Sequence, residues 1–143
     1  MKIIKREKGF TLFELLVSIS IIGILVALAS VSYSAAQRKA RNARRVQDMK
    51  AIQNAAEQYY SLSSYVYPTS RSGAWMTPSG QVVLENYPSD PKPDWTAYSS
   101  TTGTSSAYCI CAQMEDGVGG NSSSNACVFS AGADDYYCIK NQQ

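Results

Sequence analysis

The feature that most constrains this sequence is an apolar block near its start. From Phe10 to Ala36 the chain reads FTLFELLVSISIIGILVALASVSYSAA, a run of 27 residues with no proline and a single ionisable side chain, Glu14. As a helix this block would be about 40 Å long at ~1.5 Å per residue, which exceeds the ~30 Å hydrocarbon core of a bilayer. The sequence therefore predicts a helix that can span a membrane.

The helical pattern continues past the apolar block without a turn signal. Apolar residues recur there at spacings of three and four, as on one face of an amphipathic helix: Ala43, Val46, Met49, Ile52, Ala56 and Tyr59. Pro68 then marks a stop, because proline cannot continue a helix. We predict one helix from Phe10 to about Tyr60, with a membrane-type part at 10–36 and an amphipathic part at 37–61.

The rest of the chain can bury the apolar face of the amphipathic part of the helix. All five prolines lie in 62–106, which we interpret as an irregular connection with at most a short strand at 81–84. Strand-type residues then occur in three runs, at 107–114, 126–130 and 136–140. We predict an α+β fold in which the second half of the helix packs on a small antiparallel sheet formed by 107–143.

The four cysteines all lie near the C-terminus, at Cys109, Cys111, Cys127 and Cys138. An even number of cysteines in a small domain predicts disulfides, because a membrane helix could place this domain outside the cytoplasm. A zinc site is the weaker alternative, since the chain has no histidine. Cys109 and Cys111 would share one face of a strand and bond outward. This leaves two pairings, Cys109–Cys127 with Cys111–Cys138, or Cys109–Cys138 with Cys111–Cys127.

Charge is sorted along the chain. Side chains give the first nine residues a charge of +3, the segment 38–50 a charge of +5 and the residues after 50 a charge of −5. An acidic C-terminal region argues against a broad nucleic-acid surface there, because phosphate binding requires clustered lysine and arginine. Without histidine, a nucleophile elbow or a phosphate loop, the sequence predicts no enzyme, no cofactor and no metal site.

The basic run from Arg38 to Arg45 has three interpretations. It can solvate the helix as it leaves the bilayer and contact lipid headgroups. It can instead pair with acidic groups of neighbouring copies, or, with least support, bind DNA. The loop 115–125 and the pair Asp134 and Asp135 do not follow the spacing of a calcium loop. Asn121 fits a glycosylation acceptor, which is a weak signal in a serine-rich loop.

The first nine residues, MKIIKREKG, form a short basic segment that we interpret as a leader. Gly9 has no side chain, so a peptidase can approach the bond between Gly9 and Phe10. Cleavage there would make Glu14 the fifth residue of the mature chain, inside hydrocarbon, where a carboxylate costs about 2.5–3.5 kcal/mol. The α-amino group of Phe10 on a neighbouring copy is the expected partner, which makes Glu14 a register residue for assembly. The alternative is an acid that reaches the headgroups and complements the helix dipole.

The leader, Gly9, Phe10, Glu14 and the long apolar helix together resemble the class III signal of type IV pilins and pseudopilins. The resemblance implies that a membrane-embedded prepilin peptidase cuts after Gly9 and methylates Phe10. It also implies a single-pass subunit in the cytoplasmic membrane with its N-terminus inside, and an inner-membrane platform that assembles copies of the chain into a helical filament on the cell surface. Nucleic acid would be a binding partner only if the filament takes part in DNA uptake.

Within this family we expect a type IV pilus subunit first and a type II secretion pseudopilin second. A membrane-anchored ectodomain that never polymerises is a more remote alternative, and it has no use for Glu14. A secreted binding domain cut after Ala27-Leu28-Ala29 is another, although the apolar stretch continues past that site.

Overall fold

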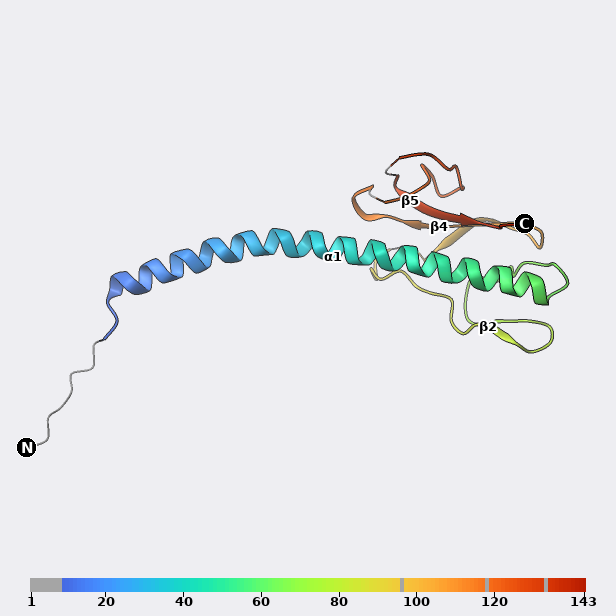
Figure 1. Cartoon of the computed structure of the whole chain (residues 1–143), viewed down its shortest axis with the longest axis horizontal. Coiled ribbons are helices and arrows are strands. Elements are labelled where there is room, and N and C mark those ends of the chain that lie inside the picture. Colours follow the sequence, from blue (N-terminus) through green and yellow to red (C-terminus); the bar gives the residue numbers. More distant parts are fainter. Residues whose placement is uncertain (1–8, 96, 118, 133) are drawn as a thin grey trace, which may run out of the picture. The chain divides into compact units, whose positions relative to one another are not determined.

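The computed structural model describes residues 9–95, 97–117, 119–132 and 134–143. The predicted leader therefore lies outside the described residues, apart from Gly9. The chain divides into two compact units, Met1–Gln37 and Arg38–Gln143. Helix α1 runs from Leu12 to Leu62, within two residues of the predicted ends, and belongs to both units (Figure 1).

In the first unit, α1 consists of exposed apolar residues. Every side chain from 10 to 34 is exposed, and the helix is long and apolar enough to cross a membrane by length and composition. Five serines along this stretch donate their hydroxyl hydrogens to backbone carbonyls three or four residues earlier, at Ser18, Ser20, Ser30, Ser32 and Ser34. Such bonds satisfy the serine hydroxyls without water, as a lipid environment requires.

In the second unit, α1 buries one face. Met49, Ile52, Ala55 and Ala56 are buried and join a core with residues of the sheet and connecting loops: Tyr67, Trp75, Tyr98, Tyr108, Ile110, Ala112 and Ile139. Of the predicted apolar face, Val46 and Tyr59 are only half-buried and Ala43 is exposed. The three-residue and four-residue spacing of apolar residues thus predicted the buried face of the helix. The core covers the middle part of that face.

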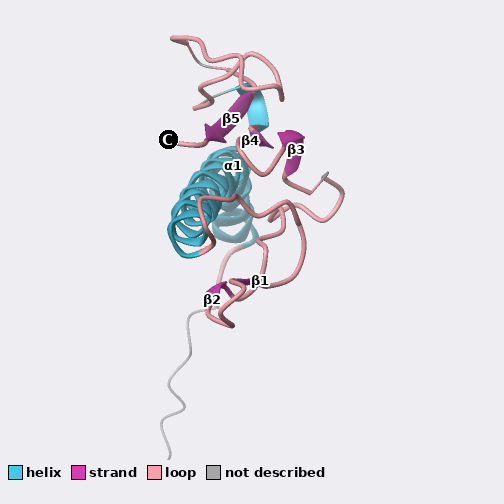
Figure 2. Cartoon of the chain, turned by 90° about the vertical axis from the view of Figure 1, so that its right-hand side faces the viewer, coloured by secondary structure: helices cyan, strands magenta, loops and turns pink. Residues whose placement is uncertain are grey.

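Two small antiparallel sheets flank this half of the helix. Strands β3 (Ser99–Gly103), β4 (Tyr108–Gln113) and β5 (Tyr136–Lys140) form a sheet in the order β3-β4-β5. Strands β1 (Trp75–Met76) and β2 (Val82–Leu84) form a separate hairpin. The three-stranded sheet lies on one side of the second half of α1 and the hairpin on the other (Figures 1 and 2).

The strand pattern differs from the sequence prediction in two places. The interval 62–106, expected to be irregular apart from 81–84, contains β1, β2 and β3. Strand β3 has a Ser/Thr/Gly sequence with no apolar alternation, and its backbone pairing with the central strand β4 defines it. The expected strand at 126–130 is wrong: only an isolated bridge between Ser122 and Phe129 occurs there. Cys127 has a φ of 54°, which interrupts an extended strand.

The C-terminal end of α1 is closed by a backbone hydrogen bond across a left-handed turn without glycine. The N–H of Tyr65 donates to the carbonyl of Tyr60 at 3.1 Å, and the two tyrosine rings contact edge to face with centroids 5.5 Å apart. Ser64 occupies the left-handed position with a φ of 54°, where glycine is the usual residue. The helix therefore ends by local hydrogen bonding six residues before Pro68.

Candidate assembly site

The start of α1 is a capping box built from Thr11 and Glu14. The backbone N–H of Glu14 donates to Thr11 Oγ1 at 3.2 Å. In return, Glu14 Oε2 accepts from the Thr11 backbone N–H and from Thr11 Oγ1, each at 2.9 Å. This reciprocal arrangement satisfies helix N–H groups that have no partner within the helix. The structure thus gives Glu14 a local role that the sequence reasoning did not assign.

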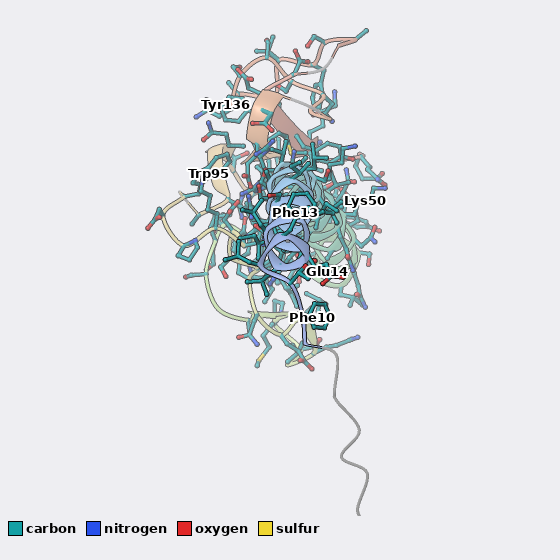
Figure 3. The ribbon with its side chains drawn as sticks, turned by 90° about the vertical axis from the view of Figure 1, so that its left-hand side faces the viewer. Phe10, Phe13, Glu14, Lys50, Trp95 and Tyr136 are labelled. Carbon is teal, nitrogen blue, oxygen red and sulfur yellow. A yellow bond between two sulfur atoms is a disulfide. The ribbon has the colours of Figure 1, made fainter. Side chains whose placement is uncertain are left out.

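The surroundings of the Glu14 carboxylate are apolar and open. Phe10 and Phe13 are 87% and 73% exposed, and Figure 3 shows both near Glu14 at the start of the helix. Among the described residues only Thr11 bonds to the carboxylate, and it does so through Oε2. The second carboxylate oxygen, Oε1, is therefore available to a partner outside this chain.

Gly9 and Phe10 precede the helix in a non-helical, exposed segment. A side chain at Gly9 would meet no atom within 4 Å. Both residues that flank the bond after Gly9 are exposed, as a peptidase requires. Cleavage at this bond and methylation of Phe10 stay predictions.

A buried ion cluster anchors the second half of α1 to the loops of its own unit. Arg45 is fully buried, and its Nε and Nη2 donate to the two carboxylate oxygens of Asp90 at 2.7 and 2.8 Å. Arg41 makes a similar two-bond contact with Glu115, at 2.6 Å for each bond. Arg45 Nη1 also donates to Glu115 Oε1 at 3.0 Å, which links the two pairs. We call Arg41, Arg45, Asp90 and Glu115 the arginine clamp.

Neighbouring groups complete the arginine clamp. Asn42 accepts from the Glu115 backbone N–H and donates to the Glu115 carbonyl, and the Trp95 ring lies 4.4 Å from the Arg45 guanidinium. The hydrogen bonds from Arg41 lower the pKa of Glu115 to about 2, against the opposing effect of burial. The sequence indicated a basic run here but gave no sign of which arginines would turn toward the same chain.

A carboxylate on α1 holds the C-terminal end of the chain. Glu57 accepts hydrogen bonds from Tyr67 Oη at 3.0 Å, from Tyr108 Oη at 3.3 Å and from the Gln142 backbone N–H at 3.0 Å. Burial and the bond to Glu57 raise the pKa of Tyr67 to about 12. The same causes raise the pKa of Tyr108. Both phenols therefore stay protonated and serve as donors at physiological pH.

Two disulfides fasten the sheet, joining Cys109 to Cys127 and Cys111 to Cys138. This is one of the two pairings that the sequence left open. Cys111 and Cys138 lie directly opposite each other in the β4–β5 register, with Cα atoms 4.1 Å apart. Cys109 instead bonds to Cys127, which lies in the loop between β4 and β5. All four sulfurs are consumed in these bonds, so none is a thiolate that could bind a metal.

The loop residues considered for calcium or a glycan have structural partners. Glu115 belongs to the arginine clamp, and Asp134 accepts a hydrogen bond from Ser130. The Asn121 side chain donates to the Cys138 carbonyl at 3.0 Å and accepts from the Cys138 N–H at 2.7 Å. Asn121 therefore covers the edge of β5, and its amide nitrogen is already in use.

Comparison with known proteins identifies the N-terminal segment. The family model of the prokaryotic N-terminal methylation motif matches residues 4–30. Type II secretion system core protein G of Vibrio cholerae is 33% identical over 93 residues, which cover 65% of this chain and 58% of that protein. Its Escherichia coli counterpart is 36% identical over 73 residues, 51% of this chain and 50% of the relative. A fimbrial protein of Pseudomonas aeruginosa is 42% identical over 53 residues, 37% of this chain and 34% of the relative.

The chain spans about half the length of the curated relatives that it matches. No solved structure matches it significantly. One long N-terminal helix with small antiparallel sheets is a pilin-like α+β arrangement. The chain is thus similar to core protein G and to fimbrial protein over part of their length, with the prokaryotic N-terminal methylation motif near its start. The motif and the apolar helix fit membrane anchoring before assembly into a filament.

Proposed function

We propose that this chain is a structural subunit of a type IV pilus-like filament. The observation that carries the proposal is the N-terminal segment, where the methylation motif over 4–30 coincides with an exposed Gly9 and a capped helix start at Thr11 and Glu14. The helix that follows exposes all its apolar side chains up to residue 34. Such a surface requires either lipid or other copies of the same helix.

Processing would prepare the chain for assembly. Prepilin peptidase would cut between Gly9 and Phe10, remove the basic leader and methylate the new N-terminal Phe10. The new amino group carries a positive charge that the precursor lacks at this position. Before assembly the apolar helix would hold the subunit in the cytoplasmic membrane with its N-terminus inside.

Assembly would then use this new charge. The Glu14 carboxylate keeps the cap through Oε2, and Oε1 would accept from the α-amino group of Phe10 on a neighbouring copy. The two groups meet only when neighbouring helices have the right axial offset, so the pair would select the register of the growing filament. An inner-membrane platform would deliver subunits. The head, by which we mean the disulfide-fastened sheets and loops of residues 63–143, would form the filament surface outside the cell.

A pseudopilin of a type II secretion system is the second candidate. The matches to core protein G support it, since one of them covers 65% of this chain, whereas the fimbrial match covers 37%. Deleting the gene separates the two candidates. Loss of surface pili with normal secretion indicates a pilus subunit, and loss of secretion with pili intact indicates a pseudopilin.

The test of the proposed function is mass analysis of the mature protein from its own host. A chain that begins at methylated Phe10 is the expected result. A chain that begins at Ser30, after ordinary signal-peptidase cleavage, or one that still carries Met1, contradicts the proposal. Negative-stain microscopy of the same preparation should show filaments that contain this chain.

A further inference from the structure

The basic segment 38–50 contains two sets of cations. Arg38, Arg41 and Arg45 pair with acidic residues of the same chain. The others form no ion pair with any residue in the described ranges: Lys39, Arg44 and Lys50. Their side chains are exposed, and we call these three residues the basic face, which extends over about 140° of the helix circumference at ~100° per residue. Figure 3 shows Lys50 on the side of the helix opposite Trp95, whose ring contacts Arg45 of the arginine clamp.

Most of the described acidic groups that form no ion pair lie on the head. Within the described part of the chain, three carboxylates on α1 form no ion pair but accept hydrogen bonds from Thr11 or from tyrosine hydroxyls: Glu14, Asp48 and Glu57. In the described part of the head, the exposed or half-buried carboxylates that form no ion pair are Glu85, Asp94, Asp134 and Asp135. Asp134 and Asp135 are the pair that lies adjacent in sequence, directly before β5. We call these two residues the acidic corner.

The acidic corner is held in place by its backbone. The Met114 N–H donates to the Asp135 carbonyl at 2.7 Å. Gly120 packs so closely that an added Cβ would lie 2.1 Å from the Asp134 carbonyl oxygen and 2.5 Å from that of Tyr136. The Asp134 carboxylate accepts a hydrogen bond from Ser130, and Asp135 is exposed. The fixed backbone of both residues lowers the entropy lost when they meet a partner.

We propose that the basic face of one copy docks onto the acidic corner of a second copy. Complementary charges on two different surfaces of one chain favour a heterologous contact, and heterologous contacts generate open helical filaments. The inference rests on the proposed function and adds the surfaces that select neighbouring heads. It is separate from the Glu14 site, because both surfaces lie within Arg38–Gln143.

Anionic lipid headgroups are a different kind of partner for the same cations. Lys39 and Arg44 lie about 5 and 12 Å beyond Ala36 along the helix at ~1.5 Å per residue, within reach of a headgroup layer. Lys50 lies about 21 Å beyond Ala36 on the same scale. Headgroups therefore account for two of the three cations and leave Lys50 without a partner.

Charge exchange in the full-length chain tests the docking. Lys39→Glu with Arg44→Glu should lower the yield of sedimentable filaments roughly tenfold, and Asp134→Lys with Asp135→Lys should do the same. All four substitutions in one chain restore opposite charges, so filament yield should return to within about twofold of the unsubstituted chain. Lys140→Glu and Glu85→Lys are matched controls outside the two surfaces and should leave the yield unchanged.

A photoreactive residue at Gln47, which is exposed between Arg44 and Lys50, identifies the partner. Crosslinks to a second copy in filaments support the docking, whereas crosslinks to phospholipid alone overturn it. Unchanged filament yield in the charge-reversed chains, or no recovery in the fourfold variant, also overturns it. If the unsubstituted chain is not cut after Gly9 and forms no filaments, the proposed function is refuted and this inference with it.

Discussion

The two halves of helix α1 have the same backbone conformation but opposite relations to water. From 10 to 34 every side chain is exposed, and these side chains are mostly aliphatic or aromatic. In the second half, Arg45, Met49 and Ile52 are fully buried against the rest of their unit. An arginine is thus buried where the chain folds on itself, while leucines and isoleucines are exposed where it does not.

This contrast shows which half depends on other molecules. The buried half gains apolar burial and ion pairs from its own chain, and two disulfides fasten the sheet on which it packs. The exposed half has only its internal hydrogen bonds, so its apolar surface needs lipid or neighbouring helices. Substitutions in the first half should therefore change assembly with little effect on the head, and substitutions in the second half should do the reverse.

The largest effect is expected from Glu14→Val. Without the carboxylate, the amino group of Phe10 on the neighbouring copy has no partner, so filaments should be absent while cleavage after Gly9 continues. Immunoblots of leader removal and electron microscopy of sheared filaments measure the two outcomes. Thr11→Val removes one hydroxyl of the cap but keeps the charge, and it should retain filaments. Normal filament yield from Glu14→Val would refute the register role.

In the second half, Arg45→Ala should destabilise the head by about 3–5 kcal/mol, because it leaves the Asp90 carboxylate buried without its partner. Both tryptophans, Trp75 and Trp95, lie in this unit, so tryptophan fluorescence of the full-length chain in detergent reports its unfolding in urea. Arg44→Ala is the matched control. Arg44 is exposed, and its loss should change the free energy of unfolding by less than about 0.5 kcal/mol.

The same contrast explains how much could be predicted from sequence. The helix, its membrane-type half and the Glu14 site follow from local patterns of apolar spacing and from a motif within eight residues. The arginine clamp joins Arg45 to Asp90 and Arg41 to Glu115, which are far apart in sequence, and the basic run gives no sign of these partners. Strand β3 was missed because its Ser/Thr/Gly residues have no strand pattern. The disulfide pairing depended on the β4–β5 register, which places Cys111 opposite Cys138.

Replacing both Cys111 and Cys138 by alanine should cost roughly 3 kcal/mol of head stability, since the bond closes a 27-residue separation in the unfolded chain. The matched variant removes Cys109 and Cys127, which are 18 residues apart, and should cost a similar amount. Urea unfolding followed by tryptophan fluorescence measures both. A loss below about 1 kcal/mol for either pair would contradict the expectation.

Acid should weaken the head through Glu115. Its pKa is about 2 in the folded chain against an ordinary value of 4.5, so the folded state binds this proton less readily than the unfolded state. The resulting stabilisation is present above pH 4.5 and is lost as the pH falls toward 2. The Glu115→Gln variant should be less stable than the unsubstituted chain at neutral pH. It should also lose less stability between pH 4.5 and pH 2. Parallel pH profiles for both chains would contradict this assignment.

The smallest effect concerns the end of the helix in the second half. Ser64 holds a left-handed φ of 54°, which a residue with a Cβ adopts at a cost. Ser64→Gly should therefore stabilise the head by about 0.5 kcal/mol, the relief of strain exceeding the entropy that glycine adds to the unfolded chain. Ser61→Gly is the control within the last turn of α1, where glycine should instead destabilise by about 0.5–1 kcal/mol. Two substitutions of the same kind three residues apart should thus have opposite signs in urea unfolding. Equal destabilisation by both would show that the left-handed conformation at Ser64 does not govern how the helix ends.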